Sequence, residues 1–306
     1  MPTPPRRLVR RRSVLAGIGA AFGGVAGCVG TSGGSGGTGT VSMLAAGSLN
    51  NALENGLRPA VDARLRVESH GSAQVARLVA EGQKDPDIVS LADVALFDGP
   101  LDPEWYAEFA TNAIVVAYNP ETEGGRRVAD AGRDGWYRPI VSGEVDLGRT
   151  DPDLDPLGYR TLFALELATD YYGTERDLRT AIPERDQIYP ETQLISQFET
   201  GSIDAAIAYR SMAVERDYDY LDLPAEIDLS DPAFAESYAT STYELPSGKV
   251  IEGGPISYGS TIRHDEPSVR DVFEAHVAGD YLPAYGFDRP DDHPRYSGDV
   301  PSEIAG

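Results

Sequence analysis

Cysteine and lysine are nearly absent from this 306-residue chain. The single cysteine, Cys28, excludes a disulfide within the chain. The lysines are Lys84 and Lys249, and 49 acidic residues against 26 basic ones give a formal net charge of −23. Nucleic-acid binding needs a basic surface, so this composition argues against it. A lysine-poor acidic surface is typical of a protein that works in high salt, although an ordinary acidic protein would also fit.

Several catalytic motifs are also missing. The chain has no Gly-x-Ser-x-Gly elbow, no His-Glu-x-x-His motif and no phosphate loop ending in Gly-Lys. Its four histidines are too scattered for a zinc pattern. His70 stands beside Gly71-Ser72, which would allow a Ser/His pair, but a solvated loop histidine is far more common. The sequence therefore predicts a protein that is not an enzyme.

The first 28 residues have the features of an export signal. Arg10-Arg11-Arg12 precede an apolar, glycine-rich run that ends in Val25-Ala26-Gly27-Cys28. The arginines resemble a twin-arginine (Tat) signal, and the last four residues resemble a lipobox, in which the cysteine carries lipid. The apolar run, roughly 15 residues, is too short for a good membrane span. We expect residues 1–28 to be a twin-arginine lipoprotein signal; a signal without lipidation is the alternative.

Residues 29–40 are mostly glycine, serine and threonine. This composition is typical of a flexible linker. A glycine loop that binds phosphate is the alternative, but no strand precedes it and no lysine ends it. Together, signal, lipid and linker predict a protein held on the extracellular face of the cell membrane through Cys28.

Apolar strands alternate with helical segments from Val41 onward, and 41% hydrophobic residues are enough for a packed core. The predicted strands are residues 41–46, 65–67, 88–91, 113–118, 205–209 and 218–221. The predicted helices begin at Ser48, Ser72, Asp155 and Pro190, and end near residues 61, 82, 173 and 201. Such alternation predicts parallel α/β sheets, and the unbroken run 113–118 predicts a strand buried on both faces.

Four predicted helix starts have the features of an anion site. Ser48, Ser72 and Asp155 occupy predicted N-cap positions, and Glu191 follows a proline at the fourth start. A helix start exposes unpaired N–H groups and partial positive charge, which attract anions. If two lobes face each other, the four starts would converge on a cleft and hold an anion without lysine or arginine. Ordinary stabilising caps are the alternative, which spacing alone favours.

Segments spread over residues 41–290 carry a family resemblance. They are residues 46–49, 71–78, 87–93, 110–112, 149–160, 190–192, 204–211, 223–232 and 254–262. In this order they resemble the archaeal molybdate/tungstate-binding proteins of ABC importers. The resemblance implies a bilobal periplasmic-binding-protein fold of the α/β class, with the ligand between two lobes of parallel or mixed sheet.

The resemblance also implies which residues bind the oxyanion. They are Gly47, Ser48 and Ser72 from the first lobe, and Asp155, the backbone of Leu157, Glu191 and Tyr209 from the second. The carboxylates of Asp155 and Glu191 would approach the metal atom itself. A carboxylate repels an anion unless the central atom accepts further oxygen ligands, as molybdenum and tungsten can and sulfur and phosphorus do not readily do. The two carboxylates would therefore select against sulfate and phosphate.

We expect a first lobe of residues 41–111 with 263–306, and a second lobe of residues 112–262. The open cleft would admit molybdate or tungstate, and the lobes would close on it. An ABC permease and its ATPase would recognise the closed form. We expect the protein to be a monomer and to need no cofactor. The alternatives are a binding protein for sulfate or phosphate, and a secreted hydrolase that uses Asp155 and Glu191 as acid and base.

Overall fold

The computed structural model describes residues 39–154, 156–182, 188–246, 248 and 250–304, which belong to one compact unit. The predicted export signal with Cys28, the linker up to residue 38, and Asp155 lie outside the described residues. The backbone of Glu191 is described, but its side chain also lies outside them. Within the described ranges, no helix is both long enough and apolar enough to span a bilayer.

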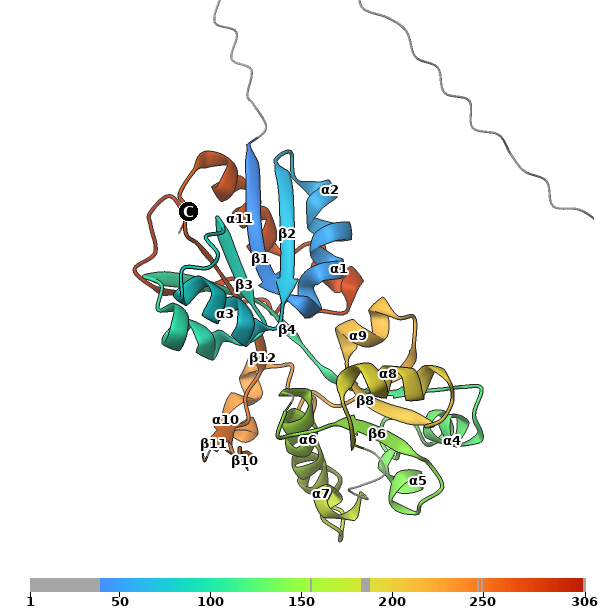
Figure 1. Cartoon of the computed structure of the whole chain (residues 1–306). Coiled ribbons are helices and arrows are strands. Elements are labelled where there is room, and N and C mark those ends of the chain that lie inside the picture. Colours follow the sequence, from blue (N-terminus) through green and yellow to red (C-terminus); the bar gives the residue numbers. More distant parts are fainter. Residues whose placement is uncertain (1–38, 155, 183–187, 247, 249, 305–306) are drawn as a thin grey trace, which may run out of the picture. The chain divides into compact units, whose positions relative to one another are not determined.

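Six strands form the first sheet, in the order β13-β4-β12-β3-β1-β2 (Figure 1). They are β1 (Thr40–Ala46), β2 (Arg64–His70), β3 (Ile88–Leu91), β4 (Trp105–Asn112), β12 (Ile256–Ile262) and β13 (Arg295–Gly298). Strand β1 is parallel to β2 and β3, as the strand–helix–strand pattern predicts. Strand β12 is antiparallel to β3 and β4, and β13 is antiparallel to β4, so the sheet is mixed.

Helices cover both faces of the first sheet. Neighbouring residues of β1 face opposite sides: Met43 packs in one buried cluster with Leu53 and Phe273, and Leu44 packs in another with Val75. The helical segments are η1 (Gly47–Leu49), α1 (Asn50–Ala52), η2 (Leu53–Leu57), α2 (Arg58–Ala60), α3 (Ser72–Ala80), η3 (Val94–Leu96), η4 (Phe97–Leu101), α11 (Pro267–Ala278) and η6 (Leu282–Tyr285). The first four follow one another without a break over residues 47–60, where the sequence predicts one helix.

Five strands form the second sheet, in the order β7-β6-β8-β5-β9. They are β5 (Ile114–Tyr118), β6 (Leu147–Thr150), β7 (Ile188–Tyr189), β8 (Ala205–Tyr209) and β9 (Asp219–Asp222). Its helices are α4 (Glu123–Ala131), α5 (Tyr137–Val141), α6 (Pro156–Tyr172), α7 (Leu178–Ala181), α8 (Glu191–Glu199) and α9 (Arg210–Glu215). Strand β5 is almost entirely buried, as predicted. The prediction of parallel sheets is wrong at this strand, which is antiparallel to both β8 and β9 because it enters directly from the first sheet.

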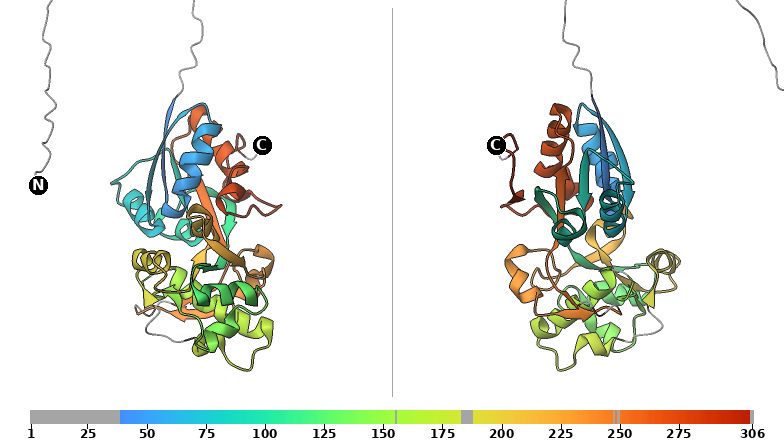
Figure 2. Two further views of the ribbon diagram at one scale, coloured as in Figure 1. Left: turned by 90° about the vertical axis from the view of Figure 1, so that its right-hand side faces the viewer. Right: turned by 60° about the vertical axis from the view of Figure 1, so that its left-hand side comes forward.

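The chain crosses between the sheets in two places (Figure 2). Strand β4 continues into β5 through Ala113, and the return runs from β9 to β12. The return holds η5 (Pro232–Phe234), α10 (Ala235–Tyr238) and the antiparallel pair β10 (Thr242–Glu244) and β11 (Val250–Glu252). Backbone hydrogen bonds hold this return segment against both crossings. The carbonyl of Asp228 accepts a hydrogen bond from the N–H of Ile114, and the carbonyl of Leu229 accepts one from the N–H of Ile256.

The sheets divide the chain at a different point from the predicted lobe boundary. Strand β12 falls within the predicted second lobe of residues 112–262, yet it lies between β3 and β4 in the first sheet. Six of its seven residues are buried, so the strand is part of the first core. We therefore propose that the first lobe resumes near Ile256 rather than at residue 263.

Asp228 is a buried carboxylate beside the crossings. Its side chain accepts a hydrogen bond of 2.8 Å from the backbone N–H of Ser230. Burial raises the pKa of Asp228 to about 6, while the hydrogen bonds from Ser230 and the charge of Arg210 act in the opposite direction. A carboxyl with a raised pKa binds its proton more tightly in the folded protein than in the unfolded chain. Its contribution to stability is therefore lost as the pH rises from about 4 to about 6.

Asp228→Asn should remove this pH dependence while keeping an acceptor for Ser230. At pH 8 we expect the variant to be about 1–3 kcal/mol more stable than the parent, because one pKa unit corresponds to about 1.4 kcal/mol. Near pH 4 the two proteins should be equally stable. Urea unfolding at a series of pH values measures the difference, and a difference that is constant with pH would contradict the account.

Candidate functional site

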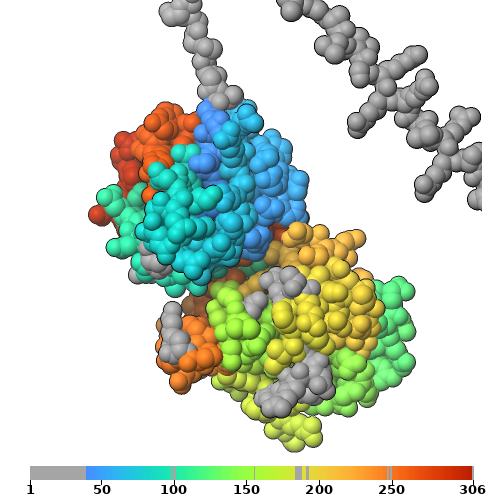
Figure 3. Space-filling model, in the orientation of Figure 1, coloured from blue at the N-terminus to red at the C-terminus, as the bar shows by residue number. Residues whose placement is uncertain are grey.

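A cleft of about 680 Å³ opens between residues of the two sheets. In Figure 3 it runs between the blue-to-teal part of the surface and the green-to-yellow part. The first sheet contributes the segments that follow β1, β2 and β3, together with Tyr258 of β12. The second sheet contributes the loop before α6, the start of α6, and residues of α8, β8 and α9. The cleft therefore collects the carboxyl ends of several strands, where α/β proteins commonly bind ligands.

Gly47, Ser48 and Ser72 line the first side of the cleft, as predicted. The prediction that the two serines are N-caps is wrong, because Ala46 and Gly71 hold the extended cap positions and each serine lies in the first turn. Their hydroxyls are bonded elsewhere. Ser72 Oγ accepts a 2.9 Å hydrogen bond from the backbone N–H of Ala92, and Ser48 Oγ lies 3.0 Å from Tyr258 Oη.

Tyr209 and Arg160 line the opposite side. Tyr209 ends β8, and its hydroxyl accepts a 2.7 Å hydrogen bond from Arg160 Nη1, one turn into α6. Burial acts against the charge of Arg160, but the nearby Tyr209, Tyr159 and Asp93 outweigh it and raise the pKa of the guanidinium above its ordinary value. Arg160 therefore stays cationic at any working pH.

The helix starts predicted an anion site without lysine or arginine, but the cleft that they line contains arginines. Arg160 lies in the cleft wall, and Arg216 of the segment after α9 lines it too. A signal was present in the sequence: Pro156 and Arg160 are four residues apart, so they share a face of the helix that opens toward the cleft. Arg216 has a different role, because it is paired with Glu199 at 3.1 Å and 37% of its side chain is exposed.

The predicted metal-binding carboxylates lie outside the described residues, and only their neighbours are described. Leu154 and Pro156, on either side of Asp155, both line the cleft, while Asp155 itself lies outside the described residues. Helix α8 begins at Glu191, one residue after the predicted start at Pro190, and its Ile195 lines the cleft. The side chain of Leu157 is 1% exposed and packs in the core, so only its backbone is a candidate for the site.

Three polar residues of the site were not among the predicted ligands. Ser211 and Tyr258 line the cleft, and the fully buried Asn112 joins them. The segments that contain these residues carry the family resemblance, which was the available signal. Their mutual contacts were not predictable, because Tyr258 reaches Ser48 across 210 positions of sequence.

The possible Ser/His pair does not form. His70 Nε2 lies 2.8 Å from Glu68 Oε1 at the protein surface, and the Ser72 hydroxyl is engaged by the backbone of Ala92. The solvated-loop interpretation of His70 is the better one.

Gly158 allows the loop before α6 to reach the cleft. A Cβ atom at this position would lie 2.5 Å from the carbonyl carbon of Asp151 and 2.5 Å from the nitrogen of Pro152, both backbone atoms. We expect Gly158→Ala to destabilise the protein by about 2–3 kcal/mol and to weaken ligand binding, because the loop must move. Gly71→Ala is the matched control, since Gly71 also lines the cleft but has an ordinary φ of −60° and no atom within 4 Å of the added Cβ. Urea unfolding should separate the two variants, and equal losses would contradict the prediction.

The cleft has the chemistry of an anion site. Hydroxyls from both sides, the starts of helices α3 and α6, and the guanidiniums of Arg160 and Arg216 line it, beside the carboxylates of Asp93, Asp153 and Glu215. The hydroxyls, helix starts and guanidiniums donate hydrogen bonds or carry positive charge, and both stabilise an anion withdrawn from water. This local arrangement contrasts with the net charge of −23 on the whole chain.

Comparisons with known proteins identify the family of the chain. The family model for bacterial extracellular solute-binding proteins matches residues 44–247. A Haloferax volcanii protein, named as an ABC transporter molybdenum-binding protein, is 56% identical over 295 residues, which is 95% of each chain. A molybdate/tungstate-binding protein of Thermococcus kodakarensis is 31% identical over 265 residues, or 75% of this chain and 74% of that one.

A solved structure shows the same fold. A sulfate-binding protein from Mycobacterium tuberculosis aligns with a TM-score of 0.53 and 14% identity, over 83% of this chain and 88% of that chain. The two mixed sheets with a cleft between them are those of the bilobal periplasmic-binding-protein fold. The chain therefore belongs to the family of extracellular solute-binding proteins, and it is a solute-binding protein rather than an enzyme.

Proposed function

We propose that the protein captures molybdate or tungstate in this cleft and presents it to an ABC permease. The observation that carries the proposal is the convergence of Ser48 and Ser72 from one side with Arg160 and Tyr209 from the other. The names of the Haloferax and Thermococcus relatives support the choice of ligand. The sulfate-binding protein of similar fold supports an oxyanion only in general, since its sequence identity is low.

A small dianion suits this set of groups. Taking an anion out of water is costly unless hydrogen-bond donors replace the lost water molecules. The two serine hydroxyls and the helix starts would supply such donors, and Arg160 would neutralise part of the charge. High salt would screen the surrounding acidic surface, so repulsion from distant carboxylates would hardly oppose binding.

Asp155 and Glu191 would complete the site by donating oxygen atoms to the metal. Support comes from their neighbours, since Leu154, Pro156 and Ile195 line the cleft. Gly47 and the backbone of Leu157 would add contacts to the oxyanion. With four oxide ligands and two carboxylates, the metal would become six-coordinate, which sulfur and phosphorus do not readily allow. This expansion would give the protein its selectivity.

The rest of the importer would meet the closed form. Binding across the cleft would draw the lobes together, and a membrane permease with its ATPase would recognise the closed surface. We also propose that the chain leaves the cell through the twin-arginine pathway, and that a lipid on Cys28 holds it at the extracellular face as a monomer. The predicted linker of residues 29–40, as far as the start of β1 at Thr40, would then serve as a tether between the membrane and the folded part of the chain.

Titration calorimetry with tungstate, molybdate, sulfate and phosphate tests the ligand assignment. We expect tight binding at one ion per chain for tungstate or molybdate, and no measurable heat for sulfate and phosphate. Tight binding of sulfate or phosphate would instead favour the general oxyanion alternative. Absence of binding to all four ions would overturn the proposal.

A further inference from the structure

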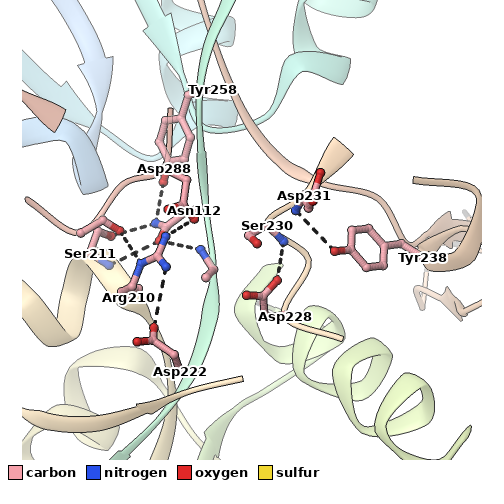
Figure 4. A network of polar contacts seen from close by, with 12 residues as sticks. Asn112, Arg210, Ser211, Asp222, Asp228, Ser230, Asp231, Tyr238, Tyr258 and Asp288 are labelled. Carbon is pink, nitrogen blue, oxygen red and sulfur yellow. Dashed lines mark hydrogen bonds and ion pairs between the residues drawn. The ribbon is translucent and has the colours of Figure 1, made fainter. Parts of the chain in front are cut away.

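Asn112 lies where the chain leaves the first sheet, and its buried side chain has a fixed orientation (Figure 4). One terminal atom accepts from the backbone N–H groups of Ala113, at 2.9 Å, and Ser211, at 3.3 Å. Backbone N–H groups only donate, so this atom must be the amide oxygen. The other terminal atom is therefore the amide nitrogen, which only donates.

The amide nitrogen of Asn112 faces two hydroxyls. Nδ2 donates to Ser211 Oγ at 2.8 Å and to Tyr258 Oη at 3.2 Å. Each hydroxyl oxygen accepts from Asn112, so each must direct its own single proton elsewhere. The side chain of Asn112 thus determines the direction of two hydroxyl protons.

The Tyr258 proton has one acceptor among the contacts of the described residues, Ser48 Oγ at 3.0 Å. Tyr258 is 1% exposed, and leaving a buried donor unpaired would cost about 1–3 kcal/mol. Burial also raises the pKa of Tyr258, so the phenol keeps its proton. Tyr258 therefore donates to Ser48, and Ser48 must turn its own proton away from Tyr258.

Both ends of this chain of hydrogen bonds lie in the cleft wall, since Ser48 and Ser211 line the cleft. The Ser72 hydroxyl is oriented in the same way, because its oxygen accepts a hydrogen bond from the backbone N–H of Ala92. Three hydroxyls that line the cleft thus accept hydrogen bonds from within the protein. Their protons remain for a ligand.

We propose that Asn112 is a positioning residue that points the hydroxyl protons of Ser48 and Ser211 into the cleft and thereby selects an oxyanion that carries no proton. The inference deepens the proposed function and rests on it. Molybdate and tungstate are fully deprotonated at neutral pH and offer only acceptors. Hydrogen phosphate retains one proton, which these hydroxyls would not accept, because their oxygens already accept hydrogen bonds from within the protein.

Asn112→Asp reverses this arrangement with almost no change of shape. The carboxylate still accepts from Ala113 and Ser211 N–H, but its second oxygen must now accept from the two hydroxyls. Tyr258 then accepts from Ser48, and the oxygen lone pairs of Ser48 and Ser211 face the ligand. We expect tungstate affinity to fall about 100-fold, partly through the added charge.

A double-mutant cycle with Tyr258→Phe distinguishes two effects of Asn112→Asp. One acts through the chain of hydrogen bonds from residue 112 through Tyr258 to Ser48, and the other is the added negative charge. Phenylalanine breaks the link to Ser48 but leaves the new carboxylate in place. The Asn112→Asp penalty in tungstate affinity should then fall to about 10-fold in the Tyr258→Phe background, as measured by calorimetry at fixed salt. An equal penalty in both backgrounds would overturn the proposal. If Asn112→Asp does not fold, Asn112→Ala replaces it in the same cycle, with a smaller coupling of the same sign expected.

Competition between phosphate and tungstate measures selectivity, which loosened packing alone would not change. We expect the ratio of phosphate affinity to tungstate affinity to be at least 10-fold higher in Asn112→Asp than in the parent protein. Equal weakening of both ligands would overturn the proposal. The parent protein's own tungstate titration tests the proposed function separately: if the parent binds tungstate and the variants behave alike, only the role of Asn112 fails.

Discussion

Arg160→Met is expected to weaken tungstate binding by about 100- to 1000-fold, the largest effect of any single change outside the two proposed metal ligands. The guanidinium is a permanent cation in a partly buried wall of the cleft, and its hydrogen bond to Tyr209 holds a second donor in place. Loss of a charge-assisted hydrogen bond with its partner left behind costs about 3–4 kcal/mol, which corresponds to this range of affinity. Titration calorimetry at one high salt concentration measures it.

Arg216→Met is the matched control for charge. Arg216 also lines the cleft, but it is more exposed and already paired with Glu199. Exposed ion pairs contribute little, so we expect a change in affinity of less than about threefold. Arg160→Lys should fall between the two, since lysine keeps the charge and loses the planar set of donors. Similar losses for Arg160→Met and Arg216→Met would mean that only the total charge of the cleft matters.

Removing the two proposed metal ligands should change which ion binds. In the Asp155→Ala, Glu191→Ala double variant, tungstate affinity is expected to fall by at least about 100-fold, because the metal returns to four-coordination. Sulfate affinity should rise, because two carboxylates that repel it are gone. The ratio of tungstate to sulfate affinity, measured by competition, is the decisive quantity.

Asp153→Ala is the control for this pair. Asp153 lines the cleft two positions before Asp155, but its carboxylate accepts a 2.6 Å hydrogen bond from the Tyr243 hydroxyl. We expect little change in the tungstate to sulfate ratio for this variant. An unchanged ratio in the double variant would instead place the carboxylates away from the metal, and the selectivity would need another cause.

The sequence predicted the parts of the fold that follow local rules. Strands β1, β2, β3, β5 and β8 lie where apolar runs occur, and helices α6 and α8 begin beside Pro156 and Pro190. Strand direction was less predictable, because the antiparallel placement of β5 and β12 depends on how the chain crosses between sheets. Strand β4 was not predicted, since its sequence includes Glu108 and Asn112 among apolar residues.

The residues that line the cleft were predicted in part. Gly47, Ser48, Ser72 and Tyr209 were implied by the family resemblance, and the structure places all four in the cleft wall. Arg160 was not predicted as a ligand, because a helix-start pattern identifies the cap residues and not those of the next turn. Hydrogen bonds that join residues 146 and 210 positions apart, as at Tyr258, leave no local pattern in the sequence.

Locating tungsten in a crystal of the tungstate complex, by its anomalous scattering, tests the central claim most directly. The account predicts one tungsten atom per chain in the cleft, with its oxygens bonded to Ser48 and Ser72 and carboxylate oxygens of Asp155 and Glu191 coordinating the metal. Tungsten bound elsewhere, or a metal in the cleft with both carboxylates turned away, would contradict it.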